Sequence, residues 1–297
     1  MGLGAAGVGA GLLYRAAPSF WQQYAREIGM PVEAAPHRPS PVLWPDQGLH
    51  AAWLGHATVL LKIDGYTIIT DPVFSTRVGL NFGPLTLGLK RLVEPALPFE
   101  DLPRVDAIVL THAHMDHFDL PTLRAMERPD VEVVTARMTS DLLRVKRYRR
   151  VQEVGWDERV RVGPLTIRGL EVRHWGARMR TDTWRGYNGF LIESARRRVL
   201  YAGDTALTHT FADVKGADLA LMPIGAYDPW IRNHCTPEQA WRMAEDARAA
   251  MVLPVHHATF QLSREPAHEP VERLINAAGP ARDRIALTQI GQQISLG

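Results

Sequence analysis

Residues 111–119 read THAHMDHFD, so five of nine side chains are histidine or aspartate. The segment directly follows VDAIVL at residues 105–110, an apolar run with the length of a buried strand. Imidazole and carboxylate groups are ligands for zinc, iron or manganese. A loop of solvated histidines is the alternative, but the H-x-H-x-D-H spacing arises by chance in roughly one chain in a thousand of this composition. We therefore predict a metal site where this strand ends.

Other apolar runs also finish in residues that could bind a metal, namely Asp71, His174, Asp204 and the pair His256 and His257. Strand ends that meet at one edge of a sheet are where open α/β proteins place their sites. Two metals about 3.5–4 Å apart can share a hydroxide whose pKa falls toward about 7, which makes a nucleophile at neutral pH. We expect Asp204, in YAGDT, to bridge two such metals.

The elements that must position these residues are short strands alternating with helices. From residue 49 onward, apolar runs and turn signals follow the rhythm of sheets covered by helices. TVLLKIDGYTIIT at residues 58–70 predicts a hairpin that turns at Asp64-Gly65. Buried strands are predicted at 105–110, 131–136, 198–204, 217–225 and 249–257.

Two helices are predicted from their start signals. DLPTLRAM begins with Asp119 as a candidate N-cap, directly after the histidine-rich segment. TPEQAWRMAEDARA, from residue 236, offers Thr236 as N-cap and Gln239 to complete a capping box. Both helices would therefore start close to candidate site residues.

Composition narrows the class of protein. The 297 residues are 46% hydrophobic and 22% charged, as in an ordinary globular protein. The net charge of +2 gives no case for nucleic-acid binding. The single cysteine, Cys235, excludes an internal disulfide and a zinc site built on paired thiolates. Any metal must therefore be held by imidazole and carboxylate groups.

The chain is predicted to form one domain at residues 49–297 with an N-terminal extension at residues 1–48, joined through the proline-rich stretch 36–45. Its first fourteen residues are uncharged and too few to span a bilayer, which takes about twenty. With Phe20, Trp21 and Tyr24 they could form a peripheral membrane anchor, and a terminal helix lying on the domain is the other interpretation. We expect a cytoplasmic protein, membrane-associated only through this segment.

Taken together, the motifs resemble the metallo-β-lactamase superfamily, and within it the branch of N-acylphosphatidylethanolamine-hydrolysing phospholipase D. Sugar-phosphate lactonases form a more distant branch. The resemblance implies an α/β fold, a four-layer αβ/βα sandwich with a two-metal site along one edge of its paired sheets. It rests on WLGHAT (53–58), TDPVFSTR (70–77), THAHMDHFD, RHWGAR (173–178), YAGDT, MPIGAYDPW (222–230), HCTPEQA (234–240) and HHATFQLSREPAHEP (256–270).

By position, the resemblance implies a complete ligand set for two metals. The first metal would take His112, His114 and His174, the second Asp116, His117 and His256, and both would share Asp204. Relatives carry tryptophan where this chain has His257, so ligation by His257 is an alternative. An imidazole-rich site without thiolate favours two zinc ions, with iron or manganese as alternatives.

Four residues are expected to act around these ligands. Asp116 could also orient the attacking hydroxide by accepting its hydrogen bond. His234 is similar to a family histidine that could donate to a developing oxyanion, and helix capping or packing is its alternative role. His56 and Asp71 match family positions, and we expect them to support ligand side chains.

Two further features have alternative interpretations. TWRGYNGF at 183–190 departs from the L-W-G-G-F-like stretch of relatives, which bears on the wall facing the substrate. The basic runs at 144–150 and 195–199 could bind an anionic lipid or phosphate, and solvated surface is the alternative.

The sequence therefore predicts a binuclear zinc hydrolase that uses a metal-bridging hydroxide. The favoured substrate is N-acylphosphatidylethanolamine or a related phosphodiester, a small molecule or lipid, cleaved by phospholipase D-like chemistry. The alternatives are a lactonase or carboxylic esterase using the same metals, including sugar-phosphate lactones, and a non-hydrolytic metal-binding scaffold. No nucleic-acid partner is expected, and the sequence predicts no oligomeric state.

Overall fold

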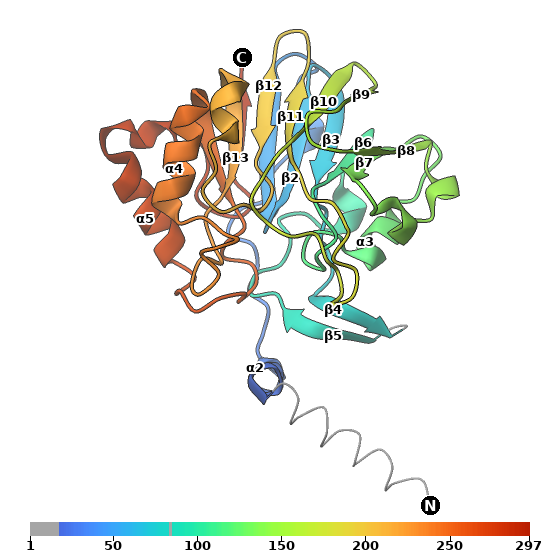
Figure 1. Ribbon diagram of the computed structural model, residues 1–297, viewed down its shortest axis with the longest axis vertical. Helices are drawn as coiled ribbons and strands as arrows, with labels where there is room; N and C mark the ends of the chain where they lie inside the picture. The colour runs from blue at the N-terminus through green and yellow to red at the C-terminus, as the bar shows by residue number, and fades with distance from the viewer. Residues whose placement is uncertain (1–17, 83–84) are drawn as a thin grey trace, which may run out of the picture.

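The computed structural model describes residues 18–82 and 85–297, and two sheets packed face to face form its centre (Figure 1). The first sheet has seven strands in the order β15-β1-β2-β3-β6-β7-β8. Their bounds are β15 Gln293–Leu296, β1 Leu49–Gly55, β2 Thr58–Ile63, β3 Tyr66–Thr70, β6 Ala107–Leu110, β7 Glu132–Ala136 and β8 Arg150–Val154.

The second sheet has six strands in the order β14-β13-β12-β11-β10-β9. Their bounds are β14 Ala249–Val255, β13 Ala217–Pro223, β12 Arg198–Tyr201, β11 Gly189–Glu193, β10 Leu165–Leu170 and β9 Arg159–Val162. A separate two-stranded ribbon pairs β4, Arg77–Phe82, with β5, Leu85–Lys90.

Helices cover the outer faces of both sheets. Helices α4, Pro237–Asp246, and α5, Glu269–Ala278, pack on the second sheet, where Trp241 and Leu274 share a buried cluster with Leu200 and Val252. Helix α3, Leu120–Ala125, lies beside the first sheet (Figure 1). A larger cluster fills the space between the sheets. The layers run helix, sheet, sheet, helix, which confirms the predicted four-layer αβ/βα sandwich.

The predicted hairpin and strands are present. β2 and β3 pair in antiparallel register, and the turn residues Asp64 and Gly65 have φ of 48° and 87°, as a tight two-residue hairpin requires. Strands β6, β7, β12, β13 and β14 lie within the five predicted buried segments. β3, β6, β7 and β8 run parallel, as do β12, β13 and β14, so their carboxyl ends gather at one edge of the sandwich.

The two helix starts differ from each other. Helix α4 has the full capping box, because Thr236 Oγ1 accepts from Gln239 N and Gln239 Oε1 accepts from Thr236 N. Asp119 occupies the N-cap position of α3, but its carboxylate makes no capping bond to the helix backbone. Instead its Oδ2 accepts from the hydroxyls of Ser75 at 2.6 Å and Thr122 at 2.5 Å. The carboxylate therefore joins α3 to the segment after β3.

Within the N-terminal segment, helix α2, Pro18–Glu27, leads to an extended stretch that lies on the sandwich. Glu33 N donates to Leu92 O at 2.9 Å, and Trp44 is buried. The predicted anchor at residues 1–14 and the side chains of Phe20 and Trp21 lie outside the described residues, and the boundary at residue 48 stays a prediction. Nowhere in the described chain is a helix long and apolar enough to cross a bilayer.

Candidate metal centre

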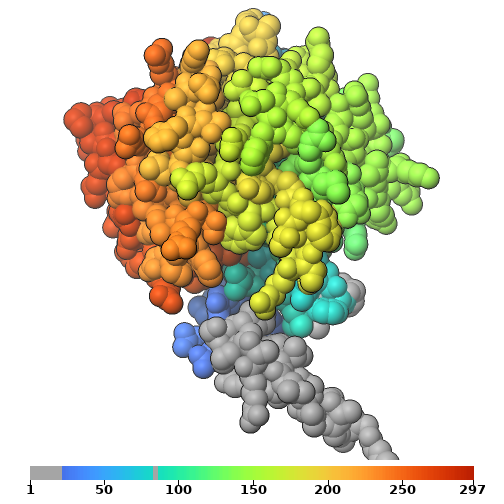
Figure 2. All heavy atoms as spheres, in the orientation of Figure 1, coloured from blue at the N-terminus to red at the C-terminus, as the bar shows by residue number. Residues whose placement is uncertain are grey.

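The strand ends bring the predicted ligands together at one edge of the sandwich. Residues 112–117 follow β6, Asp204 follows β12 and His256 follows β14 directly. The loop after β10 carries His174, and the loop after β13 carries His234. These last two loops lie side by side on one face of the molecule, where His174 Nδ1 is 3.0 Å from Asn233 O (Figure 2). Parallel strand direction thus gathers side chains from distant parts of the sequence.

The first group of ligand atoms comes from His112, His114 and His174, whose candidate atoms all lie within 4.8 Å of one another. His174 Nδ1 donates to the carbonyl of Asn233, so its Nε2 carries the lone pair in the neutral ring. That Nε2 lies 3.3 Å from His114 Nδ1, and His112 Nε2 lies 2.8 Å from the same atom. The three nitrogens face a common point, as ligands of one metal must.

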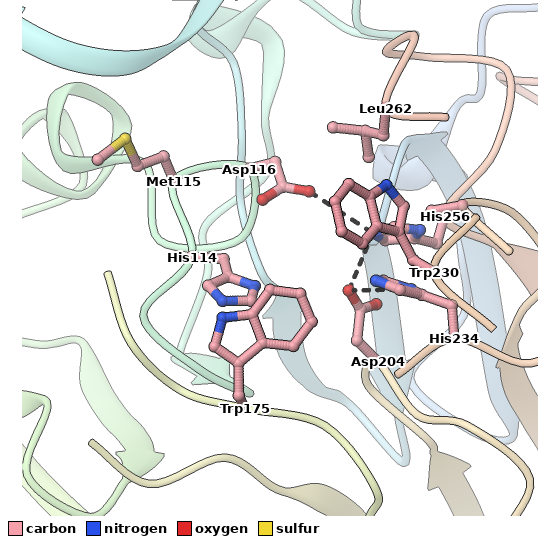
Figure 3. Close-up of a pocket in the computed structure, with 10 residues that line it drawn as sticks. His114, Met115, Asp116, Trp175, Asp204, Trp230, His234, His256 and Leu262 are labelled. Carbon is pink, nitrogen blue, oxygen red and sulfur yellow. Dashed lines mark ion pairs between the residues drawn. The ribbon is translucent and has the colours of Figure 1, made fainter. Parts of the chain in front are cut away.

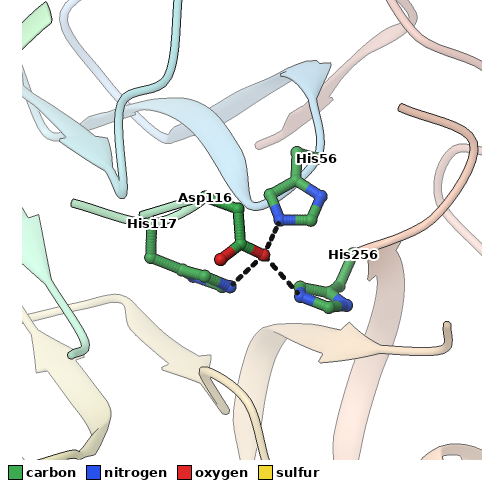
Figure 4. Close-up of side chains that lie close together, drawn as sticks. All are labelled: His56, Asp116, His117 and His256. Carbon is green, nitrogen blue, oxygen red and sulfur yellow. Dashed lines mark hydrogen bonds and ion pairs between the residues drawn. The ribbon is translucent and has the colours of Figure 1, made fainter. Parts of the chain in front are cut away.

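The second group contains Asp116, His117 and His256, together with His56 (Figure 4). His117 Nδ1 donates to Asp71 Oδ2 at 2.6 Å, which leaves its Nε2 free to face the cluster. His117 Nε2 and His256 Nε2 lie 3.6 and 3.5 Å from Asp116 Oδ2. The structure thus brings the predicted ligands of the second metal to one place.

Asp204 lies between the two groups. Its Oδ2 is 3.2 Å from His117 Nε2 and 3.0 Å from His256 Nε2 on one side. On the other side it is 4.0 Å from His112 Nε2 and 3.7 Å from His174 Nε2. A carboxylate in this position can serve both metals, which is the role predicted for it.

The residues fit a pair of metal ions because they leave buried polar atoms without hydrogen-bond partners. In the part of the chain that the structure describes, His117 Nε2, His256 Nε2 and Asp204 Oδ1 are such atoms. A buried polar atom without a partner is costly, and native proteins satisfy almost all of them. Ligation satisfies nitrogen and oxygen lone pairs at once, so the donor set is that of a metal site. The assignment of individual ligands stays a prediction.

The electrostatics of the cluster suit cation binding. Burial lowers the pKa of His112 and His174 well below the ordinary value and that of His114 to about 4, so these rings are neutral, as metal ligands must be. Burial also lowers the pKa of His117, but the Asp204 and Asp116 carboxylates outweigh it and raise that pKa well above the ordinary value. Ionised carboxylates that favour a proton there would equally favour a metal ion.

His256 and His257 occupy different surroundings. His256 Nε2 faces Asp204, whereas the His257 ring packs on Trp53 with 4.4 Å between ring centroids. No ligand group among the described residues includes His257. The geometry therefore favours His256 as the ligand.

The residues expected to support the ligands lie in contact with them. Asp71 binds His117 directly, and its Oδ2 also accepts from Tyr201 Oη at 2.6 Å. His56 Nε2 lies 3.0 Å from Asp116 Oδ2, so His56 stands among the candidate ligand atoms themselves. His234 Nδ1 lies 3.8 Å from Asp204 Oδ2. Burial lowers the pKa of His234 to about 4, so it is a neutral hydrogen-bonding group.

Arg178 is a residue whose role the sequence did not predict. It lies on the loop of His174, and its Nη1 donates to Ala113 O at 3.1 Å and to Phe118 O at 2.8 Å. One guanidinium therefore joins the His174 loop to both ends of the H-x-H-x-D-H segment. The RHWGAR motif contains this arginine, but nothing in its local pattern indicates the two carbonyl acceptors.

Tyr187 and Asn188 form a seam between the sheets and do not line the cavity beside the ligands. Tyr187 bridges to the backbone of His112, and Asn188 N donates to Thr111 O at 3.0 Å. Asn188 Nδ2 donates to Val154 O at 2.7 Å. The departure from the family pattern at 183–190 therefore falls at a structural contact.

The basic run at 195–199 is largely neutralised. Arg196, Arg197 and Arg198 pair with Asp64, Asp218 and Glu193 respectively. These pairs favour the solvated-surface interpretation of this run.

A cavity of about 260 Å³ opens beside the two ligand groups (Figure 3). Met115, Trp175, Ala226, Trp230 and Leu262 supply its apolar walls, and its floor is formed by His114, Asp116, Asp204, His234 and His256. None of these lining residues is lysine or arginine. Trp175 packs on both His114 and His174, each with 4.4 Å between ring centroids. The ligand groups thus face a space with aromatic and aliphatic sides.

A family model described as a beta-lactamase superfamily domain matches residues 66–257, which is more than half of the chain and includes every predicted ligand. The chain belongs to the beta-lactamase superfamily. As a member of this superfamily it is a metal-dependent hydrolase with the metallo-β-lactamase fold.

The chain is similar to several proteins, some of which have a described activity. An uncharacterized protein from Mycobacterium tuberculosis is 34% identical over 294 residues, which cover 92% of this chain and 76% of that protein. N-acyl-phosphatidylethanolamine-hydrolyzing phospholipase D 1 of Caenorhabditis elegans is 30% identical over 241 residues, 73% of this chain and 66% of that protein. The structure of an isothiocyanate hydrolase from Delia radicum gut bacteria has a TM-score of 0.66 at 20% identity, covering 82% and 98% of the two chains. That structural likeness shows the shared fold.

Proposed function

We propose that this hydrolase is a phosphodiesterase of the phospholipase D type, acting on N-acylphosphatidylethanolamine or a related lipid phosphodiester. The observation that carries the proposal is the cavity over the ligand groups, whose walls are apolar and whose lining residues include no lysine or arginine. A phosphodiester bears one negative charge, which two metals can neutralise, and its lipid arms need apolar walls. The likeness to the nematode phospholipase D supports the same substrate class.

The predicted ligands would hold two metal ions, zinc in our proposal. Two bound metal ions would supply Lewis acidity toward a phosphoryl oxygen and a lowered pKa for water. With a substrate bound, the apolar side chains Trp175, Trp230 and Leu262 would hold its apolar part and would exclude solvent water from the cavity. Exclusion of water strengthens every polar interaction on the cavity floor.

Two side chains on the cavity floor are suited to handle protons and developing charge. The Asp116 carboxylate is ionised, since His117 lowers its pKa well below the ordinary value against the opposing effect of burial. It can therefore accept a hydrogen bond from a water molecule and orient it. His234 is neutral, so it can donate one hydrogen bond to a phosphoryl oxygen without carrying a charge of its own.

Lactone or carboxylic ester hydrolysis is the second candidate, because the same metals would polarise an acyl oxygen. Sugar-phosphate lactones suit the cavity poorly, since no lysine or arginine lines it to hold a phosphate dianion. A lactone with an apolar substituent would fit the same walls. Substrate preference is therefore the property that separates the two activities.

The test compares hydrolysis of N-acylphosphatidylethanolamine in mixed micelles with hydrolysis of a lactone panel by the zinc-loaded protein. We expect the higher kcat/KM on the phosphodiester. His114→Ala should retain less than about one hundredth of the wild-type kcat/KM. Loss of a metal ligand should cost more than the roughly 10–100-fold that is typical when a residue hydrogen-bonded to a ligand is removed. His209→Ala, an exposed histidine, is the matched control. Higher kcat/KM on a lactone would identify a lactonase, and no hydrolysis of either class would favour a non-hydrolytic scaffold.

A further inference from the structure

Glu265 is a buried acid that takes no part in the ligand groups. Its side chain is 7% exposed, and its carboxylate accepts from Ala226 N at 2.5 Å through Oε1 and from Asp228 N at 3.2 Å through Oε2. Next to it in the chain, Arg264 N donates to Asp228 O at 2.9 Å. The segment around Glu265 is therefore bound to the turn at residues 225–228 by three hydrogen bonds.

The backbone of that turn is strained at one residue. Ala226 has φ of 64°, in the left-handed region that residues other than glycine rarely adopt. Gly225 before it packs on the backbone of His256, because a Cβ at residue 225 would lie 2.3 Å from His256 O. The turn is thus confined between a candidate metal ligand and the Glu265 carboxylate, which satisfies two of its backbone N–H groups.

The two segments that Glu265 joins both carry side chains that line the cavity. Ala226 and Trp230 belong to the turn and the loop after it, and Leu262 belongs to the segment that leads to Glu265. Trp230 and Leu262 both line the cavity, and both are labelled in the close-up of Figure 3. Trp230 is 49% exposed, so only part of its indole packs against the protein.

We propose that Glu265 is a positioning residue for substrate selectivity. By holding the left-handed turn at Ala226, it fixes the spacing between Trp230 and Leu262 and so sets how tightly the cavity binds the apolar arm of a substrate. This inference rests on the proposed function, because it takes an apolar arm next to the phosphoryl group as given. The ligand class is a phosphoryl group that carries an alkyl chain.

The test is binding of octylphosphonate and methylphosphonate to the zinc-loaded full chain, measured by calorimetry. The two probes share a headgroup and differ in the alkyl arm. We expect the wild type to bind octylphosphonate at least about tenfold more tightly, and Glu265→Ala to lose most of that ratio, while the Kd of methylphosphonate changes less than about twofold. A structural role alone would weaken both probes together. Glu265→Gln keeps the side-chain volume and one acceptor oxygen, and it should lower the affinity ratio of octylphosphonate to methylphosphonate about threefold. This variant tests the proposal if the alanine variant does not fold.

Binding by the wild type tests the proposed function, and binding by the Glu265 variants tests the role of Glu265. If the wild type prefers octylphosphonate and both Glu265 variants keep that preference, the inference about Glu265 is wrong and the proposed function stands. If the wild type binds neither probe, or binds both equally, the proposed lipid phosphodiesterase function is wrong, and the role of Glu265 in selectivity is wrong with it. Glu272→Gln, an exposed glutamate on helix α5, is the matched control and should keep the wild-type ratio.

Discussion

The Nδ1 atom of His117 lies 2.6 Å from Oδ2 of Asp71, and neither side chain is exposed to solvent. The same carboxylate oxygen accepts from Thr111 Oγ1 at 2.5 Å, and that hydroxyl lies 2.9 Å from His112 Nδ1. With Thr111 donating to Asp71, the hydroxyl oxygen accepts from His112 Nδ1. One carboxylate therefore orients a candidate ligand of each metal, one directly and one through a hydroxyl.

We expect Asp71→Asn to weaken metal binding about 10–100-fold, because the asparagine amide cannot accept all the hydrogen bonds that orient His117 and His112. Thr111→Val should have a smaller effect, confined to the group that contains His112. Competition with a chromophoric chelator measures both. Asp213→Asn, an exposed aspartate, is the control. Wild-type metal affinity in Asp71→Asn would show that the carboxylate does not orient the ligands.

Arg178→Met should loosen the contact between the His174 loop and residues 113–118. The variant loses both hydrogen bonds to carbonyl groups, and we expect the free energy of unfolding to fall by about 1–3 kcal/mol. This loss is smaller than for two fully buried bonds of a charged group, because the guanidinium is partly exposed. Urea unfolding followed by circular dichroism gives this value. Arg232→Met, an exposed arginine, is the comparison. An unchanged midpoint and slope would mean that the loop is held by other contacts.

Arg91 is expected to destabilise the fold. It is 2% exposed, and within the described residues its Nε and Nη1 have no hydrogen-bond partner. Burial lowers its pKa to about 10, so the penalty for the cation is fully present below pH 10 and declines as pH rises above it. Arg91→Met should therefore raise the free energy of unfolding at pH 7 by about 1–4 kcal/mol. The guanidinium makes one hydrogen bond, from Nη2 to Val73 O at 3.1 Å. Thermal and urea unfolding test the prediction, and a loss of stability in Arg91→Met would show that this bond and the packing of Arg91 outweigh the cost of burying the charge.

Cys235 should be unreactive in the folded protein. Burial and the nearby Asp204 carboxylate raise the pKa of its thiol, and the thiolate is the reactive form. With a single cysteine in the chain, we expect no labelling by a disulfide reagent at pH 8 without denaturant and one thiol per chain in guanidinium chloride. Rapid labelling of the native protein would show that the α4 end of the site opens.

The sequence predicted those site residues that lie close together in one motif or that follow a recognisable strand. His112 through His117 lie in one short motif, and the other predicted ligands directly follow or soon follow strands with clear apolar runs. Arg178 and Glu265 were not predicted, because their acceptor and donor groups lie 65 and 39 residues away and are backbone atoms. A contact to a distant carbonyl or N–H leaves no residue pattern to find.

In the fold too, the elements with a clear local sequence pattern were predicted and those without one were not. Buried parallel strands such as β6 and β13 were predicted because continuous apolar runs identify them. The edge strand β9, with the sequence RVRV, and the β4–β5 ribbon were not predicted, since short half-exposed strands have little apolar periodicity. Their place in the structure depends on neighbours that only the three-dimensional fold supplies.

In the proposed site, Asp204 joins two metal positions. Elemental analysis of the purified full chain after zinc loading and removal of excess metal tests it most directly, with Asp204→Asn measured alongside. The proposed site predicts about two zinc ions per chain for the wild type and fewer than about one for Asp204→Asn. A wild type that retains no metal, or an Asp204→Asn variant with the full wild-type content, would contradict it.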